Sequence, residues 1–93
     1  MTEPDIIEAV LKNNYILVKK QLECGLSVER RSTISGQTPL IIAVDNNRVD
    51  LVRLLLKHGA NISTTDKEGW SALRKAVYHN HLEILKILLQ NGG

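Results

Sequence analysis

The side chains that could carry chemistry in this sequence are few and widely spaced. The chain has three histidines and one cysteine among 93 residues. His79 and His81 are two positions apart, so on a helix they would point in different directions. No cysteine or second histidine pair adds metal-ligand spacing, so we expect no metal site and no cofactor.

Nucleophilic and acid–base chemistry also lack a matching set of residues. Cys24 is expected at the end of a helix, where the helix dipole disfavours a thiolate, and no pattern places a histidine beside it. The ten acidic residues give no paired carboxylates in a cleft, which general acid–base catalysis needs. The sequence therefore predicts that the protein is not an enzyme.

Charge and hydropathy indicate which kinds of partner and which cellular compartment to expect. Twelve basic and ten acidic side chains give a net charge of +2, and the longest basic clusters are the pairs Lys19-Lys20 and Arg30-Arg31. This balance predicts no nucleic-acid partner. No apolar run approaches the roughly 18 residues that span a bilayer, so no membrane contact is expected. A lone cysteine and first residues without a secretion signal favour an intracellular, cytoplasmic protein.

One short motif could accept a phosphate. Arg30-Arg31-Ser32-Thr33 resembles a substrate of basophilic kinases, and a phosphate on Thr33 would reverse the local charge of the loop. Short matches of this kind often arise by chance. Phosphorylation of Thr33 and an unmodified loop therefore stay open as alternatives.

The elements that must position these residues follow from an internal repeat. Gly36 and Gly69 are 33 positions apart, and the same shift aligns Ala43 with Ala76, Asn47 with Asn80, Leu56 with Leu89 and Gly59 with Gly92. The first third of the chain joins with a shift of 34, which one extra residue between Val28 and Gly36 explains. Self-similarity at this period is typical of a solenoid, whose units bury their apolar faces only against neighbouring units.

Each unit is expected to begin with a short helix. The i, i+3, i+4 spacing of one helix face occurs in three copies: Ile6, Ala9 and Val10; Leu40, Ala43 and Val44; Leu73, Ala76 and Val77. Thr38-Pro39 suits the start of such a helix, and Ser71 repeats the capping hydroxyl. Asparagine tolerates the left-handed conformation, which favours helix ends at Asn13, Asn47 and Asn80.

The second helix of each unit is apolar almost all round. In the middle unit it contains Val49, Leu51, Val52, Leu54, Leu55 and Leu56, and the last unit repeats the pattern at Leu82, Ile84, Leu85, Ile87, Leu88 and Leu89. A helix without a polar face lies between neighbouring elements. By the same register Tyr15, which aligns with Val49 and Leu82, is expected in the core.

Two stretches of the second unit resemble the signatures of the ankyrin-repeat family. Residues 36–43 (GQTPLIIA) resemble G-x-T-P-L-H-x-A, and residues 54–61 (LLLKHGAN) resemble the ending L-L-x-x-G-A-D/N. The resemblance covers the second unit completely, the third over residues 66–92, and the first in degenerate form over about residues 4–28. It implies an all-α solenoid of helix-turn-helix units joined by hairpin-like loops, intracellular and devoted to protein recognition.

The chain departs from the family pattern in the first helices and in one loop. Ile41 and Arg74 stand where the family has a histidine. In the loop before the second unit Thr33 replaces the usual aspartate, whereas Asp66 keeps it in the next loop. The first hairpin is therefore expected to be looser than the second.

A single domain of three units is expected over residues 1–93, with the units at about 4–35, 36–68 and 69–93. The first unit serves as an N-terminal cap, because Lys20 and Gln21 give it a polar outer face where the second unit has leucines. The last unit is expected to end in an uncapped apolar surface, which the register assigns to Ile84, Ile87 and Leu88. A fragment of a longer array, an end-to-end homodimer and a docked partner are the alternatives that would cover it.

Partner contacts in the family cluster at the hairpin tips and at the ends of the first helices. Carried over by register, the expected contacts are Ile34, Ser35, Gln37, Lys67, Glu68 and Trp70 in the tips, and Leu11, Lys12, Asp45, Asn46, Tyr78 and His79 on the helices. Trp70 and Tyr78 are two of only three aromatic residues, and large rings are frequent binding hot spots. The alternative for Trp70 is that it packs along the hairpin and steadies it.

The predicted function is protein–protein interaction, as an adaptor, inhibitor or targeting module. The alternative is a structural unit that self-associates, or continues a longer array, through its last repeat.

Overall fold

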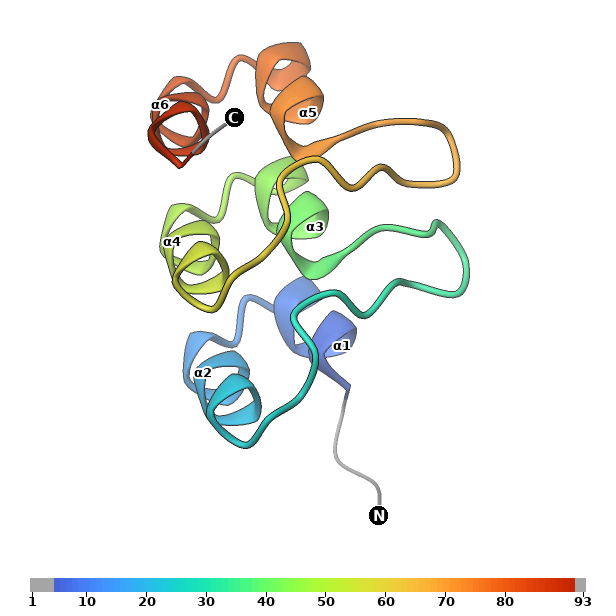
Figure 1. Ribbon diagram of the computed structural model, residues 1–93, viewed down its shortest axis with the longest axis vertical. Coiled ribbons are helices and arrows are strands. Elements are labelled where there is room, and N and C mark those ends of the chain that lie inside the picture. Colours follow the sequence, from blue (N-terminus) through green and yellow to red (C-terminus); the bar gives the residue numbers. More distant parts are fainter. Residues whose placement is uncertain (1–4, 92–93) are drawn as a thin grey trace.

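The computed structural model describes residues 5–91, and these form three helical hairpins stacked along an axis of 38 Å (Figure 1). The helices are α1 (Ile6–Leu11), α2 (Tyr15–Glu23), α3 (Pro39–Asp45), α4 (Val49–Lys57), α5 (Ala72–His79) and α6 (Leu82–Gln90). Between residues 5 and 91 the β structure is limited to one isolated bridge, from Thr65 to Ser71. The predicted all-α solenoid is confirmed. The expected start near residue 4 and the glycine expected at residue 92 lie outside the described residues.

The helices form two parallel columns. The first helix of each hairpin lies in one column, so that α3 packs between α1 and α5 (Figure 1). The second helices form the other column, with α4 between α2 and α6. The loops between α2 and α3 and between α4 and α5 extend sideways from the first column (Figure 1). The hydrophobic core runs the length of the stack between the two columns.

Each helix of the first column begins with a side-chain cap. The Thr38 and Ser71 hydroxyls accept hydrogen bonds from the backbone N–H groups three residues later, at 3.3 and 3.2 Å, and Pro39 fills the first helical position. These two predicted caps are confirmed. Asp5 caps α1 in the same way, and the hydrogen bond from the Glu8 N–H, together with the Arg30 guanidinium, lowers the pKa of its carboxyl.

Left-handed asparagines turn the chain between the two helices of every hairpin. Asn13, Asn47 and Asn80 have φ angles of 54°, 56° and 57°, as their recurrence at one register position predicts. Each asparagine stands one or two residues after the end of the first helix and leads into the second helix of its unit. The side-chain registers of the three units can therefore be compared position by position.

The N-terminal end of the stack corrects two expectations. Gln21 is buried, whereas Lys20 is exposed, so Lys20 contributes to the polar outer face and Gln21 does not. Gln21 takes the register position of the buried Leu55, and this position faces inward in both the first and the second repeat. Tyr15 was expected in the core but is exposed, because it begins α2 at the rim of the stack, where the equivalent Leu82 is exposed too.

The C-terminal end is apolar, but through different residues from those expected. Ile84, Ile87 and Leu88 are buried, because α6 turns this side toward the rest of the fold. The exposed apolar side chains include Val77 at 61% and Leu89 at 57%. Together with the half-buried Leu73 and Leu85, these two form what we call the open end.

Register explains why the open end is apolar. Val44 in α3 holds the position of Val77 and is 0% exposed, because α5 packs against α3. Val52 in α4 likewise holds the position of Leu85 and is fully buried. Within the described residues nothing packs on α5 and α6 as they pack on α3 and α4.

Candidate partner-binding face

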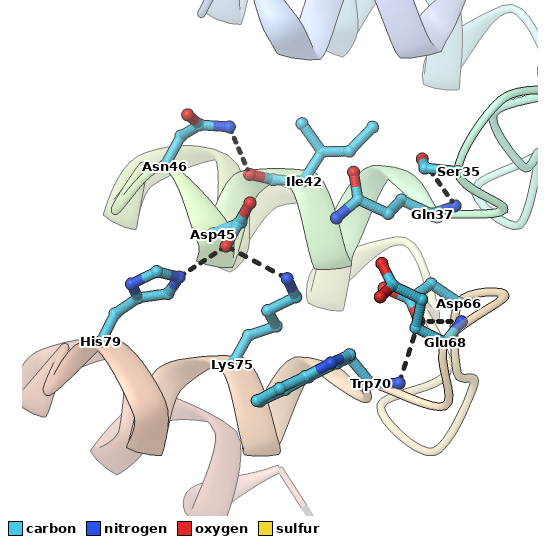
Figure 2. A network of polar contacts seen from close by, with 10 residues as sticks. All are labelled: Ser35, Gln37, Ile42, Asp45, Asn46, Asp66, Glu68, Trp70, Lys75 and His79. Carbon is cyan, nitrogen blue, oxygen red and sulfur yellow. Dashed lines mark hydrogen bonds and ion pairs between the residues drawn. The ribbon is translucent and has the colours of Figure 1, made fainter.

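The hairpin-like loop between α4 and α5 is held in place by a buried carboxylate. Asp66 is 8% exposed, and its Oδ1 accepts hydrogen bonds from the backbone N–H groups of Glu68 and Trp70, both at 2.9 Å (Figure 2). The Asp66 N–H donates to the Trp70 carbonyl, also at 2.9 Å. Two of these bonds involve the backbone of Trp70 and none involves its side chain, so the loop positions the indole without depending on it.

The hairpin before α3 is held by Ser32 rather than by Thr33. The Ser32 N–H donates to the Gln37 carbonyl at 2.8 Å, as Asp66 does to Trp70, and the Ser32 hydroxyl accepts from the N–H groups of Ile34 and Ser35 at 3.3 and 3.4 Å. Ser32 and Gln37 are five positions apart, whereas Asp66 and Trp70 are four apart, so the extra residue of the first repeat lies inside this tip. The alignment of Thr33 with Asp66 had placed the extra residue before the tip. Ser32 thus takes the place of the aspartate.

Lys67 and Arg31 join the two hairpins. The Lys67 N–H donates to the Ser35 carbonyl at 3.1 Å, and its Nζ donates to the Thr33 carbonyl at 2.9 Å. Arg31 Nη1 donates to the Thr65 carbonyl at 2.8 Å. Lys67, expected as a partner contact, therefore also holds one tip against the other. Tips linked in this way present a single preformed surface.

Trp70 lies in a cluster of aromatic and cationic side chains. Its ring centroid is 5.2 Å from that of Tyr78, with the planes at 71°, and Tyr78 itself is 71% exposed. The Arg74 guanidinium lies 4.4 Å from the centroid of the indole, and Lys75 Nζ lies 5.1 Å from it. Neither Arg74 nor Lys75 is among the partner contacts expected from the sequence. The spacing of Trp70, Arg74 and Tyr78, four residues apart each, is the signal that could have found Arg74.

Asp45 ties the second repeat to the third. Its Oδ1 lies 2.7 Å from His79 Nε2 and 3.5 Å from Lys75 Nζ, so that one carboxylate of α3 receives two side chains of α5 (Figure 2). Asp45 and His79 were both expected on the binding face, and the structure brings them together. The side chains of both residues are partly exposed, at 34% for His79 and 31% for Asp45.

The two neighbouring histidines do not point apart. The rings of His79 and His81 stack with their centroids 5.3 Å apart and their planes at 21°. The divergence expected for two positions on one helix does not apply here, because α5 ends at His79 and the left-handed Asn80, at the predicted helix end, stands between the two histidines. Over residues 5–91 no group of three or more histidine, cysteine, aspartate or glutamate side chains is placed to hold a metal ion.

The other expected contacts lie at the tips and at the ends of first-column helices. Ile34 projects from the first tip with 88% of its side chain exposed, and Glu68 is exposed on the second tip. Ser35 and Gln37 are half-buried at the base of the first tip. Three exposed residues stand at the helix ends: Leu11, Lys12, which pairs with Glu8 at 3.1 Å, and Asn46, whose Nδ2 donates to the Ile42 carbonyl at 2.9 Å.

We call the surface formed by the twelve expected contacts, Arg74 and Lys75 the recognition face. The twelve contacts are Leu11, Lys12, Ile34, Ser35, Gln37, Asp45, Asn46, Lys67, Glu68, Trp70, Tyr78 and His79. The recognition face is a broad surface made by loop tips and one helix column, and it offers aromatic rings, cations and hydrogen-bonding groups. No helix within residues 5–91 is long and apolar enough to cross a membrane, since the longest has nine residues.

Stacked helical hairpins with projecting loop tips define a helical repeat protein. The family model for ankyrin repeats (3 copies) matches residues 6–93, and the chain belongs to the ankyrin-repeat family. Ankyrin repeats are generally protein–protein interaction modules, and the fold is not enzymatic.

Several proteins with different names are similar to this chain. Ankyrin repeat and SAM domain-containing protein 6 of Rattus norvegicus is 36% identical over 91 residues, which are 97% of this chain and 10% of that protein. Notch-regulated ankyrin repeat-containing protein A of Danio rerio is 36% identical over 88% of this chain and 76% of its own length. The crystal structure of the ankyrin repeat domain of Bcl-3 superimposes with a TM-score of 0.90 at 35% identity, covering 95% of this chain and 39% of that chain. The chain thus spans only about a tenth of the first of these relatives.

Proposed function

We propose that this chain captures a protein partner on its recognition face, as an adaptor, inhibitor or targeting module. The observation that carries the proposal is the cluster around Trp70, where an indole, an exposed phenol and a guanidinium lie side by side next to the hairpin tips. Tryptophan, tyrosine and arginine are the residue types that dominate binding hot spots. The linked hairpin tips support rigid-body recognition, since they need no rearrangement to present these groups.

Trp70 is the proposed anchor of the binding face. A partner that covers the half-buried indole and Tyr78 would bury two rings whose mutual packing already restricts their motion. Rings held in this way lose little conformational entropy on binding. Binding is therefore expected to depend on Trp70 more than on the flexible side chains at the tips.

The test is capture of partners from a lysate of the source organism by the wild-type chain and by Trp70→Ala in parallel. Because Asp66 holds the loop through backbone groups, Trp70→Ala is expected to fold, and circular dichroism checks this. The variant should weaken capture by about 2 kcal/mol, or roughly 30-fold. Tyr15→Ala is the matched control, since Tyr15 is an exposed aromatic residue on α2 in the other column. Equal capture by wild type and a folded Trp70→Ala would contradict the proposal.

The proposed location is intracellular and cytoplasmic. The support is the single cysteine, Cys24, which is exposed as a free thiol, as a reducing compartment permits. Fractionation of cells that express a tagged chain tests this, and recovery from the secreted fraction would contradict it.

A second candidate function is assembly through the open end. The observation that favours it is the contrast between Val77, 61% exposed, and its equivalent Val44, 0% exposed. A further repeat of a longer array, or the open end of a second copy, would cover Val77 as α5 covers Val44. Sedimentation equilibrium of the wild type and of Val77→Asp tests self-association. A wild type that remains a monomer at high concentration would contradict the homodimer and leave the longer array.

A further inference from the structure

The cations of α5 outnumber the carboxylates that neutralise them. Between Ala72 and His79 the helix carries Arg74, Lys75 and one histidine but no acidic residue. The carboxylate that faces it from α3 is Asp45, which is already shared between Lys75 and His79. Arg74 is left with no carboxylate within 4.0 Å over residues 5–91.

The same imbalance continues onto the hairpin tips. Arg31 and Lys67 contact backbone carbonyls, which orient their charges without neutralising them, and neither has an ion-pair partner in the described part of the chain. The tips contain two acids, Asp66 and Glu68. Asp66 is buried beneath the loop and bonded to backbone amides, while Glu68 is exposed. The two tips and α5 therefore hold three cations without an ion-pair partner in the described part of the chain, Arg31, Lys67 and Arg74, whereas the exposed acid of the tips is Glu68.

Arg74 is the best placed of the three cations to bind an anion. Its guanidinium lies over the indole of Trp70, so stacking already restricts its position. A planar guanidinium can donate two parallel hydrogen bonds to a carboxylate, which a lysine cannot do. An ion pair formed beside the two rings would also be sheltered from water, which strengthens it.

We propose that the recognition face selects an acidic segment of its partner, with an aspartate or glutamate side chain paired to Arg74 and a neighbouring apolar side chain against Trp70 and Tyr78. This inference rests on the proposed function and gives its partner a chemistry. Opposite charges across an interface govern specificity and association rate, so the affinity should fall as salt is added.

A display library of random twelve-residue peptides tests the inference. Selection on the wild type should enrich aspartate and glutamate over their frequencies in the starting library. Binding of the selected peptides can be followed by the fluorescence anisotropy of a label on the peptide, a readout that also serves the variant without Trp70. Arg74→Glu should weaken the selected peptides on the order of tenfold or more. Replacing their glutamates by glutamine should have the same effect on the wild type.

Two variants serve as controls. Lys86→Glu makes the same change in net charge on α6, in the other column, and should leave peptide binding unchanged. Arg74→Lys keeps the charge but loses the planar fork, so its affinity should lie between those of wild type and Arg74→Glu. Arg74 is exposed and its backbone N–H keeps the Ser71 cap, so all variants should fold, which circular dichroism verifies.

The outcomes separate this inference from the proposed function. Selected peptides that are not acidic, or that bind Arg74→Glu as well as wild type, overturn the acidic partner. If such peptides still lose binding on Trp70→Ala, the proposed function survives. Peptides that are indifferent to Trp70→Ala, or no selected peptides at all, count against both. Equally tight binding of a single-stranded thymidine oligonucleotide would show a general affinity for polyanions, and would also overturn the inference.

Discussion

Val44 and Val77 offer a matched pair of substitutions that measures what the open end lacks. Both valines occupy the last turn of a first-column helix at equivalent register positions, yet Val44 is 0% exposed and Val77 is 61% exposed. Val44→Ala removes two methyl groups from a position that α5 covers. At about 0.8 kcal/mol per buried carbon, and with a term for the cavity left behind, the expected loss of unfolding free energy is about 2 kcal/mol.

Val77→Ala should have almost no effect on stability. The methyl groups that it removes are mostly exposed to water. The helix propensity of alanine is more favourable than that of valine by about 0.5 kcal/mol. The net change should therefore lie between zero and a stabilisation of about 0.5 kcal/mol. Urea denaturation followed by the emission of Trp70 measures both variants, and the melting temperature of Val44→Ala should fall by roughly 10 °C.

Equal losses in the two variants, measured at low protein concentration, would refute the reasoning, because something within the chain would then have to cover Val77. A loss for Val77→Ala that grows with protein concentration would instead indicate that a second copy covers the open end. The same pair of variants therefore also tests the homodimer.

Three further changes test individual contacts. Gly36→Ala should lower the unfolding free energy in urea denaturation by about 2 kcal/mol, because Gly36 has a φ of +72° and an added Cβ would lie 2.8 Å from Lys67 Cγ. Gly69→Ala is the control, since Gly69 has a φ of +84° but open space around the added Cβ, and it should lower the unfolding free energy by about half as much. Asp66→Ala removes the acceptor of two backbone N–H groups and should also cost about 2 kcal/mol, whereas an equally large loss for Thr33→Ala would contradict the assignment of Ser32 to the aspartate position. The lowered pKa of Asp5 means that its ionised form stabilises the fold above the unfolded pKa near 3.8, and that this is lost as the pH falls through the folded pKa. The stability advantage of wild type over Asp5→Asn should therefore shrink between about pH 7 and about pH 2 in thermal melts, and a constant difference would contradict it.

The fold could be predicted because its signals are local and repeated. The Thr38 and Ser71 caps bond to amides three residues away, and the left-handed asparagines act on their own backbone, so each signal depends only on its neighbours in the sequence. Repetition at a fixed period then places the helices of successive units in equivalent positions. These interactions act over a few residues and need no knowledge of how the units pack. For this reason the sequence alone determined the all-α solenoid.

Tertiary structure decided which side chains meet and which stay in water. Six of the nine residues of α6 are isoleucine or leucine, so only packing shows that Ile84 points inward and Leu89 outward. Asp45 meets Lys75 and His79 through the stacking of α5 on α3. Such contacts join residues up to 34 positions apart, and their geometry is set by the sum of many packing interactions that no local pattern records.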